Sequence, residues 1–252
     1  MVTQQQKTAS SEIVYPESDG KRMADNTKQF RWIVTIKENL EILFSDDPTV
    51  FIAGDLLWYP VEGNNRICQA PDAMVVFGRP KGDRGSYQQW KEDNIAPQVA
   101  FEILSPSNTF TEMTRKQAFY QQYGIEEYYV YDPDRNELVG LAAQAGTLLE
   151  IPEIQGWQSP RLGIRFELDD ETLHIYYPNG DRFLTPVELA AQRDRERERA
   201  EQADQRAEQE RQRAEQADQR AAEAEVRVQQ LAERLRSLGI DPDNLPSNDS
   251  SE

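Results

Sequence analysis

The distribution of aromatic side chains is the feature of this 252-residue chain that most restricts its fold. All nine Phe, ten Tyr and four Trp lie between Tyr15 and Phe183, and every lysine lies between Lys7 and Lys116. A packed globular core draws on large aromatic and aliphatic side chains, and no aromatic follows Leu184. The globular part is therefore expected to end near Pro186, and the rest of the chain needs another explanation.

The tail repeats every seven residues, which is the coiled-coil period. Its a and d positions hold mainly alanine at first and four aliphatic residues at the end, namely Val228, Leu231, Leu235 and Leu238. This pattern predicts a charged, Ala-rich helix over residues 187–238 that pairs as a coiled coil, most simply as a parallel homodimer through residues 199–238. A single solvated helix held by Glu–Arg pairs is the alternative. Gly239 and Pro242 end the helix, and residues 239–252 are expected to be a disordered acidic tail.

The formal charge of −17 argues at first against a nucleic-acid partner, because such proteins are usually basic. The tail and terminus account for −6 of it, so residues 1–186 carry −11 and remain acidic. The single Cys68 excludes a disulfide framework and a four-cysteine zinc site, and the single His174 leaves little room for a histidine-based site. No apolar stretch approaches the ~20 residues of a membrane span, and a cytoplasmic protein is expected.

The hydrophobic pattern predicts a mixed α/β domain over residues 23–186, preceded by a flexible segment over residues 1–22. A helix over residues 31–44, capped by Asp25, Asn26 or Thr27, precedes three strands at 50–59, 69–77 and 98–104. A second helix over 109–123 and a strand over 127–132 follow. Further short strands are expected at 137–141, 148–151, 164–167 and 173–177.

Two acids interrupt the apolar strands. Asp72 follows Pro71 at the start of Ala-Met-Val-Val-Phe, and Glu102 stands between Val-Ala-Phe and Ile-Leu. A carboxylate buried there without a partner costs several kcal/mol, so each needs a donor, a cation or an exposed edge. Two such acids on consecutive strands suggest a divalent-cation site, because Mg²⁺ prefers oxygen ligands. The alternative is that both pair with arginine or backbone donors.

Four stretches together resemble the Uma-two family of endonucleases, part of the PD-(D/E)XK, restriction-endonuclease-like superfamily. They are Pro71-Asp72, Glu102-Ile103-Leu104-Ser105-Pro106-Ser107, Lys116 with Tyr120, and Gly124-Ile125-Glu126-Glu127-Tyr128-Tyr129-Val130-Tyr131-Asp132-Pro133. The resemblance covers roughly residues 15–183 and implies a restriction-endonuclease-like core. Leu104 stands where the superfamily has its lysine. The Uma-two family shows the same loss, with the lysine on the following helix, and Lys116 is the matching position.

The resemblance implies Mg²⁺- or Mn²⁺-dependent hydrolysis of phosphodiester bonds in DNA, with double-stranded DNA as the expected partner. Asp72, Glu102 and the Ile103 carbonyl would hold the ion, and Lys116 would orient the attacking water or stabilise negative charge. Further candidates from the sequence are two extra metal ligands and four phosphate contacts in the long connection after residue 77. These are Asp55 and Glu38 for the metal, and Arg79, Lys81, Arg84 and Lys91 for the phosphates.

The polar and aromatic residues beside these motifs have simpler interpretations. Ser105 and Ser107 are expected to cap the helix or turn the chain, and Tyr120 and Tyr123 to pack in the core. Two functions compete for the whole chain. The first is an endonuclease whose dimer cuts both strands of a duplex. The second is a weak or silent nuclease-fold scaffold that acts through its coiled coil, which the acidic domain favours. A nucleotide phosphohydrolase is a remote third.

Overall fold

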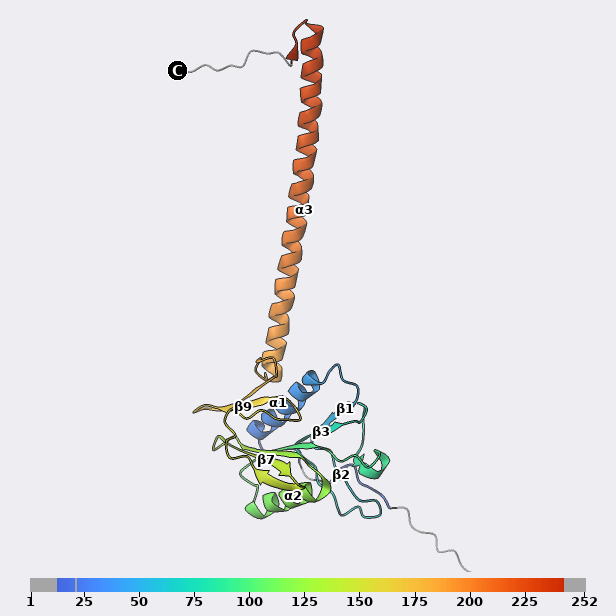
Figure 1. Cartoon of the computed structure of the whole chain (residues 1–252), viewed down its shortest axis with the longest axis vertical. Coiled ribbons are helices and arrows are strands. Elements are labelled where there is room, and N and C mark those ends of the chain that lie inside the picture. The colour runs from blue at the N-terminus through green and yellow to red at the C-terminus, as the bar shows by residue number, and fades with distance from the viewer. Residues whose placement is uncertain (1–12, 21, 243–252) are drawn as a thin grey trace, which may run out of the picture. The chain divides into compact units, whose positions relative to one another are not determined.

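The computed structural model describes residues 13–20 and 22–242, and its globular unit consists of a six-stranded sheet with a helix on each face (Figure 1). Helix α1 (Thr27–Leu43) covers one face and α2 (Phe110–Tyr123) covers the other. This arrangement confirms the predicted α/β class, and the predicted order helix, three strands, helix, strand holds for the strands that belong to the main sheet. The expected flexible segment and acidic tail lie partly outside the described residues, at residues 1–12, 21 and 243–252.

The main sheet has the strand order β1-β3-β5-β6-β7-β8. Its strands are β1 (Val50–Ala53), β3 (Ala73–Phe77), β5 (Val99–Ile103), β6 (Glu127–Asp132), β7 (Glu137–Gln144) and β8 (Thr147–Glu150). Within the main sheet the β5–β6 pair is parallel and the others are antiparallel, because α2 carries the chain from the end of β5 back to the start of β6. Two small sheets pair β2 (Trp58–Tyr59) with β4 (Tyr87–Gln88) and β9 (Arg165–Leu168) with β10 (Leu173–Tyr176).

Local signals explain where both helices begin and end. The Asn26 side chain accepts a hydrogen bond from the Gln29 backbone N–H and caps α1, and Thr109 caps α2 in the same way. Helix α2 ends at Gly124, whose φ of 101° is the left-handed conformation that glycine adopts without strain. Helix α1 places Ile33, Ile36 and other apolar side chains against the sheet, as the helical spacing predicts.

The single strand predicted over residues 50–59 is wrong. Strand β1 ends at Ala53, and the chain turns at Asp55, whose φ of 49° lies in the left-handed region that no regular strand adopts. The chain resumes as β2 and pairs with β4, which lies inside the connection after residue 77 together with the short helix η1 (Gln89–Lys91). The turn at Asp55 brings that carboxylate to the cavity described below.

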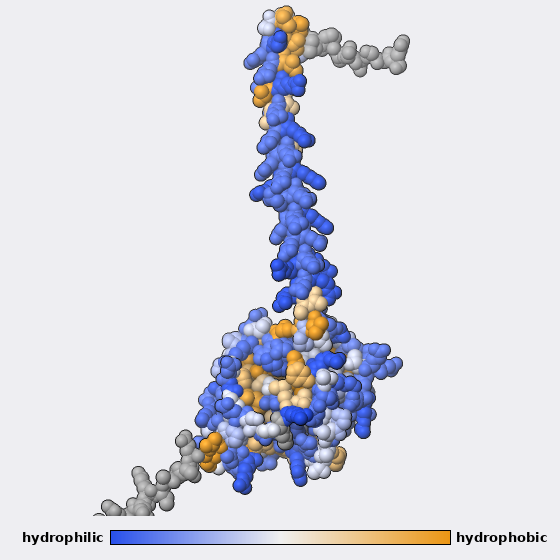
Figure 2. All heavy atoms as spheres, turned by 180° about the vertical axis from the view of Figure 1, so that it is seen from behind, coloured by the Kyte–Doolittle hydropathy of each residue, from blue (hydrophilic) through white to orange (hydrophobic). Residues whose placement is uncertain are grey.

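The second unit begins at Ala190, within helix α3 (Pro186–Ser237), which is 52 residues long. The predicted tail helix is therefore present, while its pairing stays a prediction. Most of its length is hydrophilic, and apolar side chains gather at its C-terminal end (Figure 2). The exposed ones there are Val226, Val228, Leu231, Leu238 and Ile240. In the described part of the chain, every helix is too short or too polar to cross a membrane.

Candidate active site

The antiparallel pairing of β3 with β5 brings Asp72 beside Glu102. Ala73 is the register partner of Phe101, so the residue before Ala73 lies next to the residue after Phe101. Both acids are buried, with 8% of Asp72 and 2% of Glu102 exposed. Asp72 Oδ2 accepts a hydrogen bond of 2.6 Å from the Ile103 backbone N–H. The two acids singled out by the sequence therefore meet at one point of the sheet.

Helix α2 supplies two donors to Glu102. Lys116 Nζ lies 2.7 Å from Glu102 Oε2, and the Tyr120 hydroxyl donates to Glu102 Oε1 at 2.5 Å. The two donors are four residues apart, so they lie on the same face of the helix. Tyr120 is fully buried and packs against Trp58, as expected for a core residue, but its hydroxyl also makes it part of the site. The structure therefore places Lys116, the lysine that the resemblance assigned to the site, beside Glu102.

Burial sets the ionisation of the two acids. Desolvation raises the pKa of Asp72 well above its usual value, and the like charge of Glu102 raises it further. Desolvation also raises the pKa of Glu102, although Lys116 and Tyr120 act in the opposite direction. Burial lowers the pKa of Lys116, but the attraction and hydrogen bond of Glu102 outweigh it, so this pKa is raised and Lys116 is held as an ammonium. Two ionised acids would face one cation.

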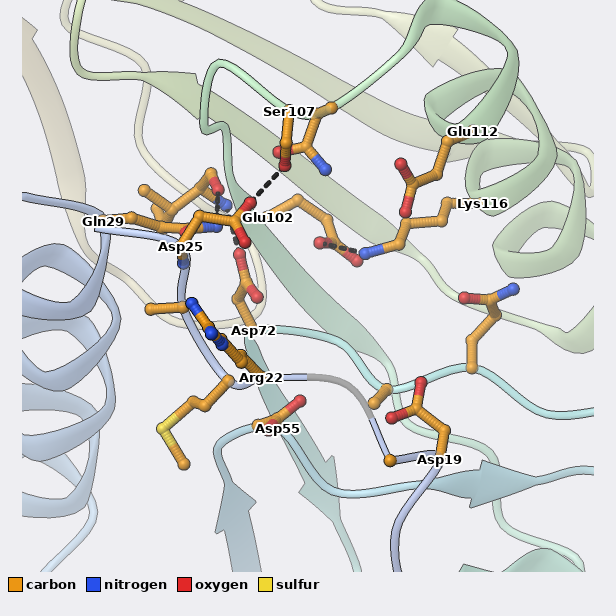
Figure 3. Close-up of a pocket in the computed structure, with 17 residues that line it drawn as sticks. Asp19, Arg22, Asp25, Gln29, Asp55, Asp72, Glu102, Ser107, Glu112 and Lys116 are labelled. Atoms are coloured by element: carbon orange, nitrogen blue, oxygen red, sulfur yellow. Dashed lines mark hydrogen bonds and ion pairs between the residues drawn. The ribbon is translucent and has the colours of Figure 1, made fainter.

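These side chains line a cavity of about 510 Å³ (Figure 3). The segment before α1 contributes Asp19, Arg22 and Asp25 to the cavity, which the sequence did not predict. Asp25 is fixed there because the hydroxyls of Ser105 and Ser107 both donate to its carboxylate. These two serines tie the loop after β5 to the segment before α1, whereas the cap of α2, one of the roles predicted for them, is Thr109.

Gln29 also lines this cavity and was not predicted. Its Nε2 donates to the Ile103 carbonyl at 2.8 Å, and its Oε1 accepts from the Asp25 backbone N–H at 2.8 Å. The sequence contained a signal, because Gln29 shares the buried stripe of α1 with Ile33, Ile36 and Leu40, where a polar side chain needs partners. The contact holds the Ile103 carbonyl, one of the predicted metal ligands, in a fixed position.

The two extra ligand candidates lie in different places. Asp55 lines the cavity, and burial together with the charge of Asp19 raises its pKa. Glu38 does not line the cavity; its carboxylate pairs with Lys37 at 3.0 Å on α1. Asp55 can therefore serve the site as a further acid, whereas Glu38 is not brought to it in this structure.

The four predicted phosphate contacts do not line the cavity either. Glu92 pairs with Arg79 at 2.9 Å and with Arg84 at 2.7 Å, and both arginine side chains are largely buried. Lys81 Nζ donates to the backbone carbonyl of Phe44 at 2.6 Å. The fourth, Lys91, lies in η1. Their contact with a nucleic acid stays a prediction, and the charge of both arginines is already matched within the domain.

The donor set suits a hard divalent cation. Two carboxylates and a backbone carbonyl are the oxygen ligands that Mg²⁺ takes, and Mg²⁺ usually keeps several waters, which the cavity has room for. Within the described residues, no group of three or more His, Cys, Asp or Glu side chains is close enough to hold a metal ion. The protein ligands would therefore be Asp72, Glu102 and the Ile103 carbonyl, with Glu102 shared between the ion and α2.

The chain matches a family model and is similar in part to a solved structure. The family model "Uma2: Putative restriction endonuclease" matches residues 21–200. A solved structure, "a putative nuclease belonging to DUF820 from Anabaena variabilis ATCC 29413", is 16% identical with a TM-score of 0.41. The match covers 54% of this chain and 72% of that chain. No curated protein matches the sequence.

Proposed function

Because the chain belongs to the Uma2 family, whose description is "Putative restriction endonuclease", we propose that it is a Mg²⁺- or Mn²⁺-dependent endonuclease that hydrolyses phosphodiester bonds of DNA. One observation carries the proposal. Asp72 and Glu102, two buried acids on neighbouring strands, meet at a cavity with the Lys116 ammonium 2.7 Å from Glu102. Two buried acids against one ammonium leave the site short of positive charge, which a divalent cation would supply.

The contacts of each residue indicate its role in the proposed reaction. Asp72, Glu102 and the Ile103 carbonyl would hold the ion, which when bound polarises the scissile phosphate and lowers the pKa of a bound water. Lys116 reaches the same point from α2, where its ammonium can orient the attacking water or stabilise the negative charge that develops on the phosphate. Tyr120 and Gln29 keep Glu102 and the Ile103 carbonyl in place. The water oxygen bonds to phosphorus, and the bond from phosphorus to one sugar oxygen breaks.

Dimerisation through residues 199–238 belongs to the same proposal. The exposed Val228, Leu231 and Leu238 lie at the a and d positions of the last heptads, where a second helix would bury them. Alanine at the earlier positions buries little area, so these last heptads would supply most of the stability of the pair. A dimer carries two sites and could cut both strands of a duplex.

Cleavage of supercoiled plasmid tests the proposal. The wild-type chain is expected to nick or linearise the plasmid with Mg²⁺ and to stop when EDTA is added. Asp72→Asn and Glu102→Gln are expected to lose about 100-fold or more of the rate, because each removes a ligand charge. Glu153→Gln, an exposed acid outside the cavity, is the matched control and should cleave like the wild type. Equal rates in all four proteins would overturn the assignment.

A nuclease-fold scaffold is the second candidate, and two observations favour it. Residues 1–186 carry a net charge of −11, which repels phosphates, and both Glu102 oxygens already have donors. Calorimetry with Mn²⁺ separates the two candidates. Binding that is lost in Glu102→Gln supports the nuclease, whereas the absence of carboxylate-dependent binding supports a scaffold that acts through the tail.

A further inference from the structure

A second cavity, of about 700 Å³, lies between the start of α2 and strands β6 and β7. We refer to it as the α2 groove. Leu104 and Ser105, which directly follow β5, line it, and Asn108 lines both this groove and the catalytic cavity. The groove therefore begins two residues after Glu102 and adjoins the catalytic site. A polymer bound with one phosphate at Glu102 would have its next nucleotide within reach of the groove.

An exposed aromatic ring stands at the rim of this groove. Phe110 is 88% exposed, the largest value among the exposed large apolar side chains of the described chain. It is the first residue of α2, directly after the Thr109 cap, so the helix start needs no phenylalanine. Val139, on β7, lines the groove as well and is 43% exposed. An aromatic side chain left in water forfeits the stabilisation of burial, which suggests a role outside the folded domain.

The buried wall of the groove contains an unused polar group. Tyr128 lines the groove with 1% of its surface exposed, and its hydroxyl has no hydrogen-bond partner among the described residues. Its ring packs against Tyr120, with 5.0 Å between the centroids, and Tyr120 bonds Glu102. A buried hydroxyl without a partner is unfavourable, and a buried water would satisfy it.

We propose that the α2 groove binds the unpaired nucleobase next to the scissile phosphate, stacked on the Phe110 ring. The proposal rests on the proposed nuclease function and names its substrate class. A nucleobase has apolar faces, one of which can stack on the Phe110 ring, and polar edges, which can meet polar side chains of the lining such as Asn108 and Gln117. The charges at the rim are paired, Asp132 with Arg135 and Asp134 with Lys28, so the rim tolerates a neutral base better than a second phosphate.

This geometry favours a strand with an unpaired base over a continuous duplex. A base inside a duplex is stacked on both faces, and taking it out costs a few kcal/mol unless it is mismatched or single-stranded. The groove would therefore select nicked, mismatched, flapped or single-stranded positions within DNA. A fully paired linear duplex is expected to be the poorer substrate.

The test uses the full chain and oligonucleotides with 2-aminopurine, a base whose fluorescence is quenched by stacking, at successive positions. Ca²⁺ replaces Mg²⁺ so that binding is measured without turnover. Wild type and Phe110→Trp are expected to change the fluorescence at one position of a single strand. Phe110→Ala should lose the change and bind about 5- to 100-fold more weakly. Phe30→Ala, an exposed phenylalanine of α1 that does not line the groove, is the matched control.

If Phe110→Ala gave the same fluorescence change and the same affinity as the wild type, base binding in the α2 groove would be refuted. The absence of any fluorescence change with the wild type would refute it as well. Other outcomes would refute the proposed nuclease function without refuting base binding in the α2 groove, or the reverse. A Phe110-dependent change without Mg²⁺-dependent cleavage by the wild type would refute the nuclease and leave the groove. Cleavage of single strands by the wild type and Phe110→Ala with equal kcat and KM would refute the groove and leave the nuclease.

Discussion

Replacing Lys116 by Met removes the only cation that Glu102 contacts among the described residues. The side chain of Lys116 is 14% exposed and that of Glu102 is 3% exposed, so solvent screens the pair weakly. Breaking such a pair leaves a buried charge and costs about 3–5 kcal/mol. For a domain of this size, each kcal/mol lowers Tm by about 2–4 °C, so a decrease of roughly 6–20 °C is expected in the absence of divalent cations.

The loss should depend on pH in a defined direction. Burial already raises the pKa of Glu102, and without the ammonium it rises further, so the folded variant takes up a proton more readily than the unfolded chain. When the pKa of an acid is higher in the folded than in the unfolded state, the free energy of unfolding of the protein increases as the pH falls through the folded-state pKa. The deficit of Lys116→Met is therefore largest at neutral pH and shrinks on acidification.

Urea denaturation of four proteins provides the measurement: wild type, Lys116→Met, Glu102→Gln and the double variant, all in EDTA. The double variant contains neither charge and should be more stable than Lys116→Met alone, with a coupling energy of about 1–3 kcal/mol. Lys28→Met, an exposed lysine, is the matched control and should change stability by less than about 0.5 kcal/mol. Additive effects in the cycle, or a Lys116→Met as stable as the wild type, would refute the buried pair.

Three further variants test other parts of the account. Tyr120→Phe removes the donor to Glu102 Oε1 and should lower the free energy of unfolding by about 1.5–3 kcal/mol; an unchanged urea midpoint would contradict that bond. Asp72→Asn should raise Tm at neutral pH in EDTA while it abolishes cleavage, because the buried carboxyl with a raised pKa is unfavourable when ionised; the gain should vanish at low pH, and a lower neutral Tm would count against it. Leu231→Asp should turn the dimer into a monomer in light scattering with the domain Tm unchanged, and a monomeric wild type would refute the coiled coil.

Helices and strands that are bounded by capping or breaking residues such as glycine and proline were predictable from the sequence. Strand β6 lies at the predicted residues because Gly124 ends the helix before it and Pro133 follows its last residue. Helix α2 was expected one residue early because Thr109, its cap, already belongs to the pattern. In both cases the deciding interactions are within a few residues, so a sequence pattern contains them.

Elements that depend on distant pairing could not be predicted. The break at Asp55 is a left-handed turn, and the residues after it gain their hydrogen bonds from β4, about thirty positions further along the chain. The mainly apolar run 50–59 contains Gly54 and Asp55 at the break, but nothing in it indicates the distant partner of its second half. Tertiary context therefore decided between one long strand and two short ones.

The residues of the candidate site likewise include some that the local sequence indicates and others that only tertiary packing brings there. Asp72 and Glu102 stood out because carboxylates are costly in apolar strands, whatever the fold. Tyr120 did not, because a tyrosine on the apolar face of a helix is the expected core residue, and its bond to Glu102 exists only after α2 packs on the sheet. The contribution of Asp19 and Arg22 was equally hidden, since no local pattern places the segment before α1 at the cavity.

The central claim is that Asp72 and Glu102 form a divalent-cation site served by Lys116. Anomalous diffraction from crystals of the full chain soaked with Mn²⁺ tests it most directly, because the Mn²⁺ signal locates the ion independently of activity. One ion is expected within bonding distance of both carboxylates and of the Ile103 carbonyl, with Lys116 Nζ still beside Glu102. A crystal soaked to saturation with no peak at these carboxylates, or with its peaks elsewhere, would contradict it.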